Sequence, residues 1–346
     1  MARFRLGFLT HLEGHGDLRR IYKETLELFV VADELGFDVG WVAQHHLKRA
    51  GGGLPSPFPF LAAVAQRTKH IRLGTSVVVL PLEKPLRVAE DAAVVDALSD
   101  GRLELGVGSG LDREAFSAFG VDVEQRGALT SEGLKIIQRA LRGEGLGDYG
   151  LEMLPPAPGL VDRMWQGSMS LAGAQNVGKA GIGLMLARSA IGAPVGQPLH
   201  EAQWPFYQAY LDNWDPANGK PRLGISRGVF PAESRQAALD GLRDDVLAYA
   251  SRIAQQRNQP LPSSLEEICA QQYIAYGSSE DIVASLSADT LLPHADDLIL
   301  QFNPAVPSFE RAVKQLEQIA TEIAPALGWK PRWAAVNESD PVALEA

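Results

Sequence analysis

Short apolar segments alternate with longer segments of helical period along the whole chain. The apolar segments carry few charges, as expected of strands that are buried on both faces. The longer segments repeat hydrophobic residues every three or four positions, which is typical of amphipathic helices. This alternation indicates a parallel sheet crossed by helices. Eight strands are predicted at 4–9, 39–42, 71–79, 103–107, 164–166, 182–186, 223–229 and 298–302, and eight helices at 18–35, 58–68, 85–98, 131–141, 172–180, 199–214, 232–256 and 308–324.

Eight successive strand and helix units predict a (β/α)8 TIM barrel. We expect residues 1–330 to form this single α/β domain and residues 331–346 to form a C-terminal tail. A barrel of this kind needs about 250 residues. Two insertions take up the surplus, near 142–162 and near 260–280, and the second is expected to add a helix over the barrel.

Composition and charge narrow the class of protein. Hydrophobic residues make up 46% of the 346 positions, enough for a sizeable core, and the formal net charge is -10. That charge argues against nucleic acid or an anionic membrane as a partner. The single cysteine, Cys269, cannot form an internal disulfide, and the first residues carry no apolar targeting segment. We therefore expect a cytoplasmic protein without membrane or nucleic-acid partners.

Polar residues follow most of the predicted strands. In a (β/α)8 barrel these positions gather at one mouth, where binding sites are found. A buried polar group without a partner costs about 1–3 kcal/mol, so a polar ligand is expected at this mouth. The group comprises Thr10, His11, Glu13, Gln44, His45, His46, Thr75, Ser76, Ser109, Ser168, Ser170, Arg188, Ser189, Arg227, Gln301 and Asn303.

Two adjacent histidines, His45 and His46, end the second predicted strand. Imidazole exchanges protons near neutral pH, so at least one of them is a candidate for catalysis or ligand contact. The alternative is a structural pair bonded to backbone. Since alternate strand residues face opposite sides, only one ring is expected to face the mouth. A metal site with His11 and Glu13 as further ligands is a weaker alternative, because no spacing fixes four donors, and no metal is predicted.

Glycine-rich and serine-rich turns follow the fourth and fifth strands. Segment 103–110 is rich in glycine, but the next residue, Leu111, stands where a dinucleotide fingerprint requires a third glycine. An S-adenosylmethionine loop is an alternative, although 111–120 is too short for the helix and strand that would follow it. At 167–170, Gly-Ser-Met-Ser precedes a predicted helix, so these residues form either a phosphate site or an ordinary N-cap.

An ordered series of motifs runs from Trp41 to Gly120. This series resembles the luciferase-like monooxygenases, a flavin-dependent family with a (β/α)8 fold that includes bacterial luciferase. Weaker similarity continues to 276–278. The motifs are Gln-His-His at 44–46, Leu-Pro-Ser-Pro at 54–57, Thr-Lys-His-Ile-Arg-Leu-Gly-Thr at 68–75, Pro-Leu-Arg-Val-Ala-Glu-Asp at 85–91, Asp-Ala-Leu-Ser-Asp-Gly-Arg at 96–102 and Phe-Ser-Ala-Phe-Gly at 116–120.

The resemblance implies roles for the residues around the flavin ring. His45 would lie near the reactive face of the flavin, with His46 beside it as a second catalytic candidate. A non-proline cis peptide would fall within 75–77 and lie against the ring, which makes Thr75 and Ser76 cofactor-binding candidates.

The resemblance also implies a site for the phosphate of FMN. Ser168 would help to hold that phosphate, and Gly167 and Ser109 are further cofactor-binding candidates. The luciferase branch has a Cys-Arg pair at 108–109 and a glutamate at 167, and this chain has neither. The phosphate charge would then be balanced by helix N-termini, or by Arg188 or Arg227, of which Arg188 is the chosen candidate.

The implied activity is a monooxygenation that uses reduced FMN (FMNH2) and O2 and proceeds through a C4a-peroxyflavin on a small organic substrate. No other segment of the sequence carries a dinucleotide fingerprint, so a separate NAD(P)H:flavin reductase would supply the reduced flavin. A homodimer is expected by analogy. Three alternatives stay open: a deazaflavin (F420)-dependent oxidoreductase, a non-catalytic flavin-binding protein and a methyltransferase. Substrate identity is not indicated by the loops.

Overall fold

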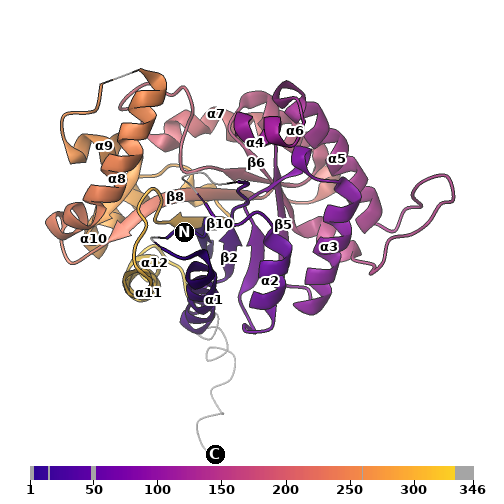
Figure 1. Ribbon diagram of the computed structural model, residues 1–346, viewed down its shortest axis with the longest axis horizontal. Helices are drawn as coiled ribbons and strands as arrows, with labels where there is room; N and C mark the ends of the chain where they lie inside the picture. Colours follow the sequence, from indigo (N-terminus) through magenta and orange to yellow (C-terminus); the bar gives the residue numbers. More distant parts are fainter. Residues whose placement is uncertain (1–3, 15, 48–51, 259, 332–346) are drawn as a thin grey trace, which may run out of the picture.

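All strands of the structure lie in one parallel sheet, and eight of them close into a barrel (Figure 1). The computed structural model describes residues 4–14, 16–47, 52–258 and 260–331, so nearly all of the predicted tail at 331–346 lies outside the described residues. Pairing of β10 with both β8 and β1 closes the ring. The (β/α)8 prediction is confirmed. The barrel strands are β1 (Arg5–Thr10), β2 (Val39–Val42), β3 (Arg72–Thr75), β5 (Leu103–Gly108), β6 (Met164–Ser168), β7 (Gly183–Leu186), β8 (Leu223–Pro231) and β10 (Asp297–Gln301).

Helices surround the barrel on its outer side, as Figure 1 shows. Each of the eight predicted helices overlaps an observed one, and the bounds of α1 and α3 agree with the prediction. Helices α4 and α10 were not predicted, and α9 lies within the segment 260–280. The helices are α1 (Leu18–Leu35), α2 (Pro57–Ala65), α3 (Pro85–Leu98), α4 (Arg113–Ala118), α5 (Arg126–Leu141), α6 (Leu171–Ala180), α7 (Leu199–Leu211), α8 (Arg235–Arg257), α9 (Leu265–Gln271), α10 (Ser279–Ser287), α11 (Phe309–Gln318) and α12 (Ala324–Ala326).

Two strands differ from the prediction. The predicted strand 71–79 is two strands, β3 and β4 (Val78–Val79), separated by a cis peptide between Ser76 and Val77. Strand β9 (Ile274–Gly277) was not predicted; it pairs with the last four residues of β8 beyond the barrel. Segment 111–120 forms α4, so the strand that an S-adenosylmethionine loop requires is not found in this described stretch.

Two tryptophans fill the barrel interior. Trp41 and Trp165 are fully buried, with ring centroids 6.1 Å apart in an edge-on arrangement. Glycines on neighbouring strands make room for them: a Cβ at Gly74 would lie 2.0 Å from Trp41, and one at Gly183 would lie 2.3 Å from Trp165. The interior is therefore a packed core and not a channel.

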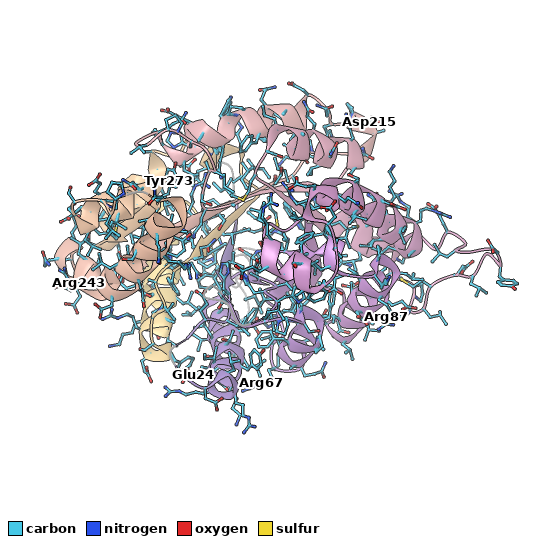
Figure 2. All side chains as sticks on the ribbon, turned by 45° about the horizontal axis from the view of Figure 1, so that its top comes forward. Glu24, Arg67, Arg87, Asp215, Arg243 and Tyr273 are labelled. Atoms are coloured by element: carbon cyan, nitrogen blue, oxygen red, sulfur yellow. The ribbon has the colours of Figure 1, made fainter. Side chains whose placement is uncertain are left out.

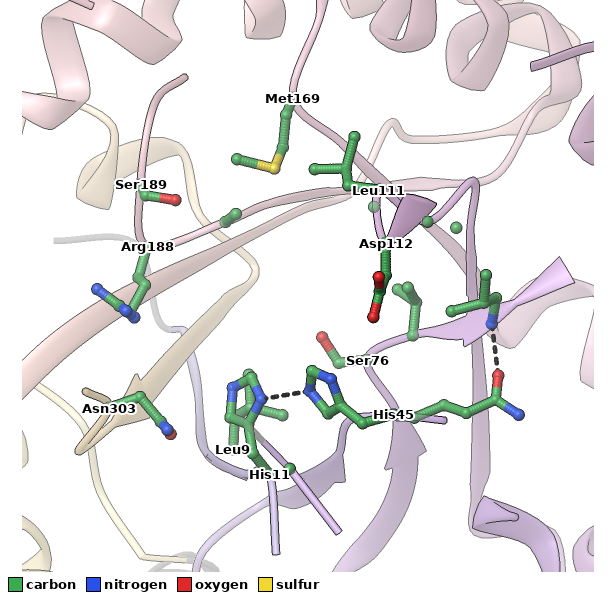
Figure 3. Close-up of a pocket in the computed structure, with 18 of the residues that line it drawn as sticks. Leu9, His11, His45, Ser76, Leu111, Asp112, Met169, Arg188, Ser189 and Asn303 are labelled. Atoms are coloured by element: carbon green, nitrogen blue, oxygen red, sulfur yellow. Dashed lines mark hydrogen bonds between the residues drawn. The ribbon is translucent and has the colours of Figure 1, made fainter. Parts of the chain in front are cut away.

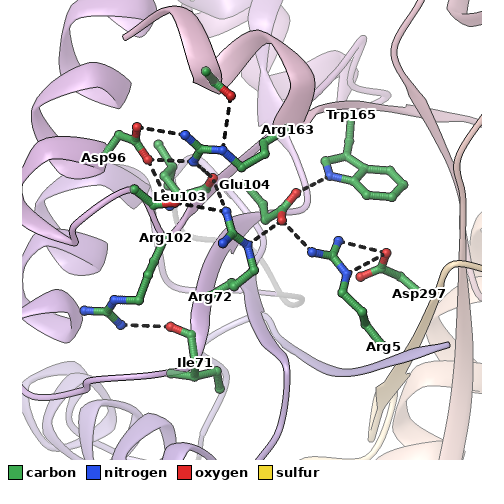
Figure 4. A network of polar contacts seen from close by, with 12 residues as sticks. Arg5, Ile71, Arg72, Asp96, Arg102, Leu103, Glu104, Arg163, Trp165 and Asp297 are labelled. Carbon is green, nitrogen blue, oxygen red and sulfur yellow. Dashed lines mark hydrogen bonds and ion pairs between the residues drawn. The ribbon is translucent and has the colours of Figure 1, made fainter. Parts of the chain in front are cut away.

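A buried polar network closes the amino-terminal end of the barrel (Figure 4). Glu104 accepts hydrogen bonds from Arg5 at 2.7 Å, from Arg72 at 2.6 Å and from the Trp165 indole at 2.6 Å. Arg5 also pairs with Asp297 at 2.9 Å. Burial raises the pKa of Glu104, but the two arginines outweigh it and hold that pKa below its ordinary value. With this end closed, a ligand reaches the barrel from its carboxyl end.

Charged side chains stand on the outer faces of the helices, where Figure 2 shows Glu24, Arg67, Arg87 and Arg243 at the periphery. Some of them form solvated surface pairs, for example Arg67 with Glu27 at 2.6 Å. Such pairs contribute little to stability. Among the described residues, none of the helices has the length and apolar character needed to cross a bilayer.

Candidate active site

A cavity of about 1480 Å³ opens at the carboxyl ends of the barrel strands. Ligand pockets commonly measure roughly 300–1,000 Å³, so this one has room for a cofactor together with a substrate. Seven of the predicted site residues line it: His45, His46, Ser76, Ser109, Gly167, Ser168 and Arg188. The polar barrel mouth expected from the sequence is therefore present.

Thr75 was predicted as a cofactor contact, and it lies behind the cavity wall instead. Its side chain is fully buried, and its hydroxyl donates to the Gly106 carbonyl at 2.8 Å while accepting from the Gly106 N–H at 2.9 Å. Both capacities of the hydroxyl are thus used between β3 and β5. The cis peptide follows it, at Ser76–Val77, within the predicted segment.

Both histidines of the pair line the cavity, so the expectation that only one would do so is wrong. The reason is local: β2 ends at Val42, and residues 43–46 have left the strand, so side chains no longer alternate between two faces. The ring of His46 packs edge-on against Phe119, with centroids 4.7 Å apart, and its buried Nε2 has no hydrogen-bond partner in the described part of the chain.

A chain of hydrogen bonds runs from His45 into the barrel (Figure 3). His45 Nε2 lies 2.8 Å from His11 Nδ1, and His11 Nε2 lies 3.3 Å from Gln301 Oε1. The Gln301 amide donates to the Ser226 hydroxyl at 2.5 Å. With Gln301 Oε1 as the acceptor, a neutral His11 donates from Nε2 and accepts at Nδ1. His45 therefore donates from Nε2, and its Nδ1 is the atom with a free lone pair.

The surroundings of His45 favour the neutral ring. Burial lowers its pKa, and His46 acts in the same direction, while Asp112 raises it. Burial likewise lowers the pKa of His46. The backbone fixes the ring closely: the His45 N–H donates to Leu54 at 2.9 Å, and a Cβ at Gly52 would lie 2.2 Å from His45 Cδ2. An imidazole that is neutral at pH 7 can accept a proton.

The serines after β6 shape the amino-terminal end of α6. Ser170 is the N-cap and accepts from the Gly173 N–H at 3.1 Å, so the ordinary N-cap interpretation holds for this residue. Ser168 donates to the Ser170 carbonyl at 3.1 Å and lines the cavity. A Cβ at position 173 would lie 2.3 Å from the Ser168 hydroxyl, so the glycine leaves the space around it open.

Helices α5 and α6 are neighbours, and Gln138 of α5 donates a hydrogen bond to the Ala180 carbonyl of α6 at 3.0 Å. Both helices begin at the cavity, and the first residue of α5 is Arg126, which lines it together with Thr130. Sequence analysis missed Arg126. This residue directly follows the 3-10 helix Val123–Gln125 and lies before the predicted helix 131–141, so no predicted strand end pointed to it.

The two arginines considered for the phosphate differ in position. Arg227 is buried in an ion pair with Asp289 at 2.5 Å and also donates to Gln203 at 3.1 Å, so it is not available at the cavity. Arg188 lines the cavity and donates to the Gln272 carbonyl at 3.3 Å. Burial lowers the pKa of its guanidinium, and Tyr249 raises it.

The metal alternative gains no support from the contacts of its two residues. His11 bonds His45 and Gln301, and the Asn303 amide donates to Glu13 at 2.5 Å. In the described ranges, no group of three or more histidine, cysteine, aspartate or glutamate side chains is placed to hold a metal ion.

Comparison with known proteins gives a match over most of the chain. The sequence profile of the luciferase-like monooxygenases matches residues 3–292. The 4-hydroxyprotoasukamycin monooxygenase of Streptomyces nodosus is 31% identical over 238 residues, which is 65% of this chain and 63% of that protein. The oxygenase component of the flavin-dependent trigonelline monooxygenase of Acinetobacter baylyi is 32% identical over 145 residues, 40% of each chain. The chain thus aligns with less than two thirds of the length of these curated relatives.

Solved structures share the fold along nearly the whole chain. Monooxygenase RslO1 from Streptomyces bottropensis is 25% identical, with a TM-score of 0.77 over 94% of this chain and 100% of that one. The oxygenating constituent of 3,6-diketocamphane monooxygenase from Pseudomonas putida, in complex with FMN, is 17% identical, with a TM-score of 0.74 over 94% and 99%. The coenzyme F420 dependent tetrahydromethanopterin reductase of Methanopyrus kandleri is 15% identical, with a TM-score of 0.68 over 94% and 99%.

Proposed function

Because the chain belongs to the luciferase-like monooxygenase family, we propose that it binds reduced FMN at the barrel mouth and uses O2 to oxygenate a small organic substrate. Members of this family are oxidoreductases, and so is this protein. One observation carries the finer proposal: a cavity of about 1480 Å³ in which His45 and the cis peptide at Ser76 line the same wall region at the ends of β2 and β3.

The residues present fit a flat ring against this wall. Positions 108 and 167 are glycines that line the cavity beside Val77, and a Cβ at Gly108 would lie 2.5 Å from the Val77 side chain. A larger residue there would displace the segment that follows the cis peptide. The Nε2 atom of His46, which has no hydrogen-bond partner in the described ranges, offers a further polar contact at the cavity.

The phosphate of FMN would lie between the first turns of α6 and α5. Helix N-termini present free N–H groups and a positive dipole end to an anion. Ser168 adds a hydroxyl, and Arg126 adds the positive charge that the family's arginine at position 109 would otherwise supply. Ser109 lines the same cavity and is kept in the proposed cofactor set.

His45 would manage a proton at the reacting face. Its Nδ1 has no hydrogen-bond partner among the described residues, and Figure 3 shows the ring in the same cavity as Ser76 and Asp112. His11 is a positioning residue that acts through its 2.8 Å contact with His45, since it fixes which nitrogen of that ring carries hydrogen. Reduced FMN, when bound, would supply the oxygen chemistry.

A separate NAD(P)H:flavin reductase is part of the proposal. The trigonelline relative is named an oxygenase component, which supports a division of labour of this kind. A deazaflavin-dependent reductase is the second candidate, because the reductase of Methanopyrus kandleri has the same fold.

Reconstitution of the purified protein tests the cofactor. We expect the fluorescence of FMN to be quenched when it binds. The dissociation constant from this titration should be at least tenfold below that of F420. Tighter binding of F420 would replace the monooxygenase with the deazaflavin reductase. Stopped-flow mixing of the reduced FMN complex with O2 then separates an oxygenase from a flavin-binding protein, because only the oxygenase should give a transient absorbance change before reoxidation. Calorimetry with S-adenosylmethionine, expected to show no heat, tests the methyltransferase.

A homodimer is proposed through α3. Three apolar side chains of this helix are exposed: Leu86, Val94 and Leu98 at 39%, 46% and 47%. Their spacing of eight and four residues places them on one side of the helix. An apolar group of this kind on a helix face is typical of an interface with a second copy.

A further inference from the structure

A second group of polar side chains lines the cavity beside α8. It comes from the turns after β1, β7 and β10 and from α8 itself. Figure 3 shows Arg188 and Asn303 on one side of the His11 and His45 rings, and Ser76 and Asp112 on the other. We name this group the α8 compartment; it comprises Glu13, Arg188, Tyr249, Arg252 and Asn303.

Two arginines of the α8 compartment share one aromatic ring. The guanidinium carbon of Arg188 lies 5.9 Å from the Tyr249 centroid, and that of Arg252 lies 5.1 Å from it. Within the described part of the chain, neither arginine forms an ion pair with a carboxylate. Arginine keeps its charge in proteins and carries five N–H donors, so donors of both residues remain unused beside the cavity.

Two carboxylates line the cavity near these arginines, and each accepts a hydrogen bond from a neutral donor. Glu13 accepts from the Asn303 amide at 2.5 Å; burial raises its pKa, and the charges of Arg252 and Arg188 lower it. Asp245 accepts from the Val306 N–H at 2.7 Å. Among the described residues, neither of these carboxylates is in direct ion-pair contact with Arg188 or Arg252, so guanidinium donors at the cavity are left for a carboxylate from outside the chain.

We infer that the α8 compartment binds a carboxylate of the organic substrate, so that the compound oxygenated is an organic acid. This inference rests on the proposed function, since it takes the cavity to hold a flavin and a substrate together. The planar fork of a guanidinium matches the two oxygens of a carboxylate, and the Tyr249 ring offers an apolar surface to the carbon skeleton next to it. An acid held there would extend past His11 toward His45, on the proposed reacting face.

The phosphate of FMN is another anion that two arginines could bind, so the test has two arms. The first arm compares carboxylates with their uncharged amides. Benzoate, phenylacetate and octanoate are titrated against benzamide, phenylacetamide and octanamide by calorimetry, on the protein with and without FMN. At least one acid should bind about tenfold or more tightly than its amide. Equal binding of every acid and amide pair would overturn the inference.

Variants locate that preference. Arg252→Gln and Arg188→Gln should each remove it, so that acid and amide then bind within threefold of each other. Arg243→Gln is the matched control, because Arg243 lies on the same helix with an exposed side chain and pairs with Asp240 on the surface. Melting temperatures equal to that of the original protein exclude unfolding as the cause. A preference that persists in both cavity variants would overturn the inference.

The second arm identifies the source of the anion. FMN and riboflavin differ in the phosphate, so the ratio of their dissociation constants reports phosphate binding. We expect Arg188→Gln and Arg252→Gln to leave this ratio unchanged within threefold. A ratio that collapses in these variants would assign the compartment to the flavin phosphate and overturn the substrate inference. If neither flavin binds the original protein, the proposed function fails, whereas the carboxylate titration without FMN still decides the anion site.

Discussion

At the scale of the residue, the cavity is organised around one imidazole whose orientation is set from behind. His45 is held by its own N–H, by the close approach of Gly52 and by His11, and each contact involves a different atom of the residue. Such redundancy leaves Nδ1 as the ring atom that faces the cavity. The neutral state that burial favours makes this atom a base at pH 7.

Replacing His45 tests this assignment. His45→Ala should lower turnover by roughly 10²–10⁴, the usual effect of losing an acid or base group, while FMN affinity stays within a few-fold. Steady-state oxygenation with an added flavin reductase and fluorescence titration with FMN measure the two quantities. His46→Ala is the matched control and should have the smaller effect on turnover. An unchanged rate in His45→Ala would remove this residue from the mechanism.

The pH profile gives an independent test of the same imidazole. Because burial lowers the pKa of His45, the ring stays neutral further into acid than an exposed histidine does, with an ordinary value of 6.5. Turnover limited by this base should therefore fall only below that pH. His11→Phe removes the partner of Nε2 and should shift the profile and reduce kcat with little change in FMN affinity. A profile that is identical in His11→Phe would contradict the positioning role of His11.

At the scale of the element, the first turn of α6 carries the proposed phosphate contact. Ser168→Ala should weaken FMN binding by about 1–2 kcal/mol, because a hydrogen bond to a charged group is lost. Riboflavin, which has no phosphate, should bind the variant and the original protein equally. Ser170→Ala is the comparison variant, because it removes the N-cap bond to Gly173. It should lower the stability of the protein and leave the ratio of FMN to riboflavin affinity unchanged. Equal loss of both flavins in Ser168→Ala would reject the phosphate site.

Most barrel elements follow directly from the sequence, because their signals are local. Helix α1 begins after Asp17, which accepts from the Arg19 N–H, and ends at Gly36 in the left-handed region. Strand β9 escaped prediction since only four residues pair, and they pair with β8 beyond the barrel. Helix α4 has six residues after a glycine-rich turn, too few for a clear period.

The site was predictable in its position and less so in its detail. The mouth of a barrel follows from strand order, which placed His45, Ser168 and five other residues on the cavity wall. Thr75 was misplaced because a strand end gives no sign that its hydroxyl is used by the neighbouring strand. Arg252 was missed because it lies on α8, far in sequence from every strand end, and only the fold brings it to the cavity.

At the scale of the whole molecule, the exposed face of α3 predicts association. Val94→Asp would place a charge in the proposed interface and should convert a dimer into a monomer of 37.3 kDa in light scattering. Val195→Asp is the matched control, since Val195 is 84% exposed and lies outside that helix. A dimer that survives Val94→Asp, or a monomeric original protein, would reject the α3 interface.

The closed end of the barrel predicts how stability depends on pH. Burial raises the pKa of Asp297 to about 6, and Glu104 adds to this while Arg5 opposes it. In the unfolded chain the same carboxyl has a pKa near ~3.9, so the folded state binds the proton more tightly. Its contribution to stability is therefore complete below about pH 4 and is lost as the pH rises through 6, by roughly 2–3 kcal/mol.

Asp297→Asn removes this titration and should show it as a difference between two pH values. The free energy of unfolding of the variant, relative to the original protein, should increase by roughly 2–3 kcal/mol between pH 4 and pH 7.5. Denaturant titrations at both pH values measure it. Asp148→Asn replaces a carboxyl by an amide at an exposed position and should give a constant difference. A constant difference for Asp297→Asn would mean that this buried carboxyl stays ionised beside Arg5 throughout the range.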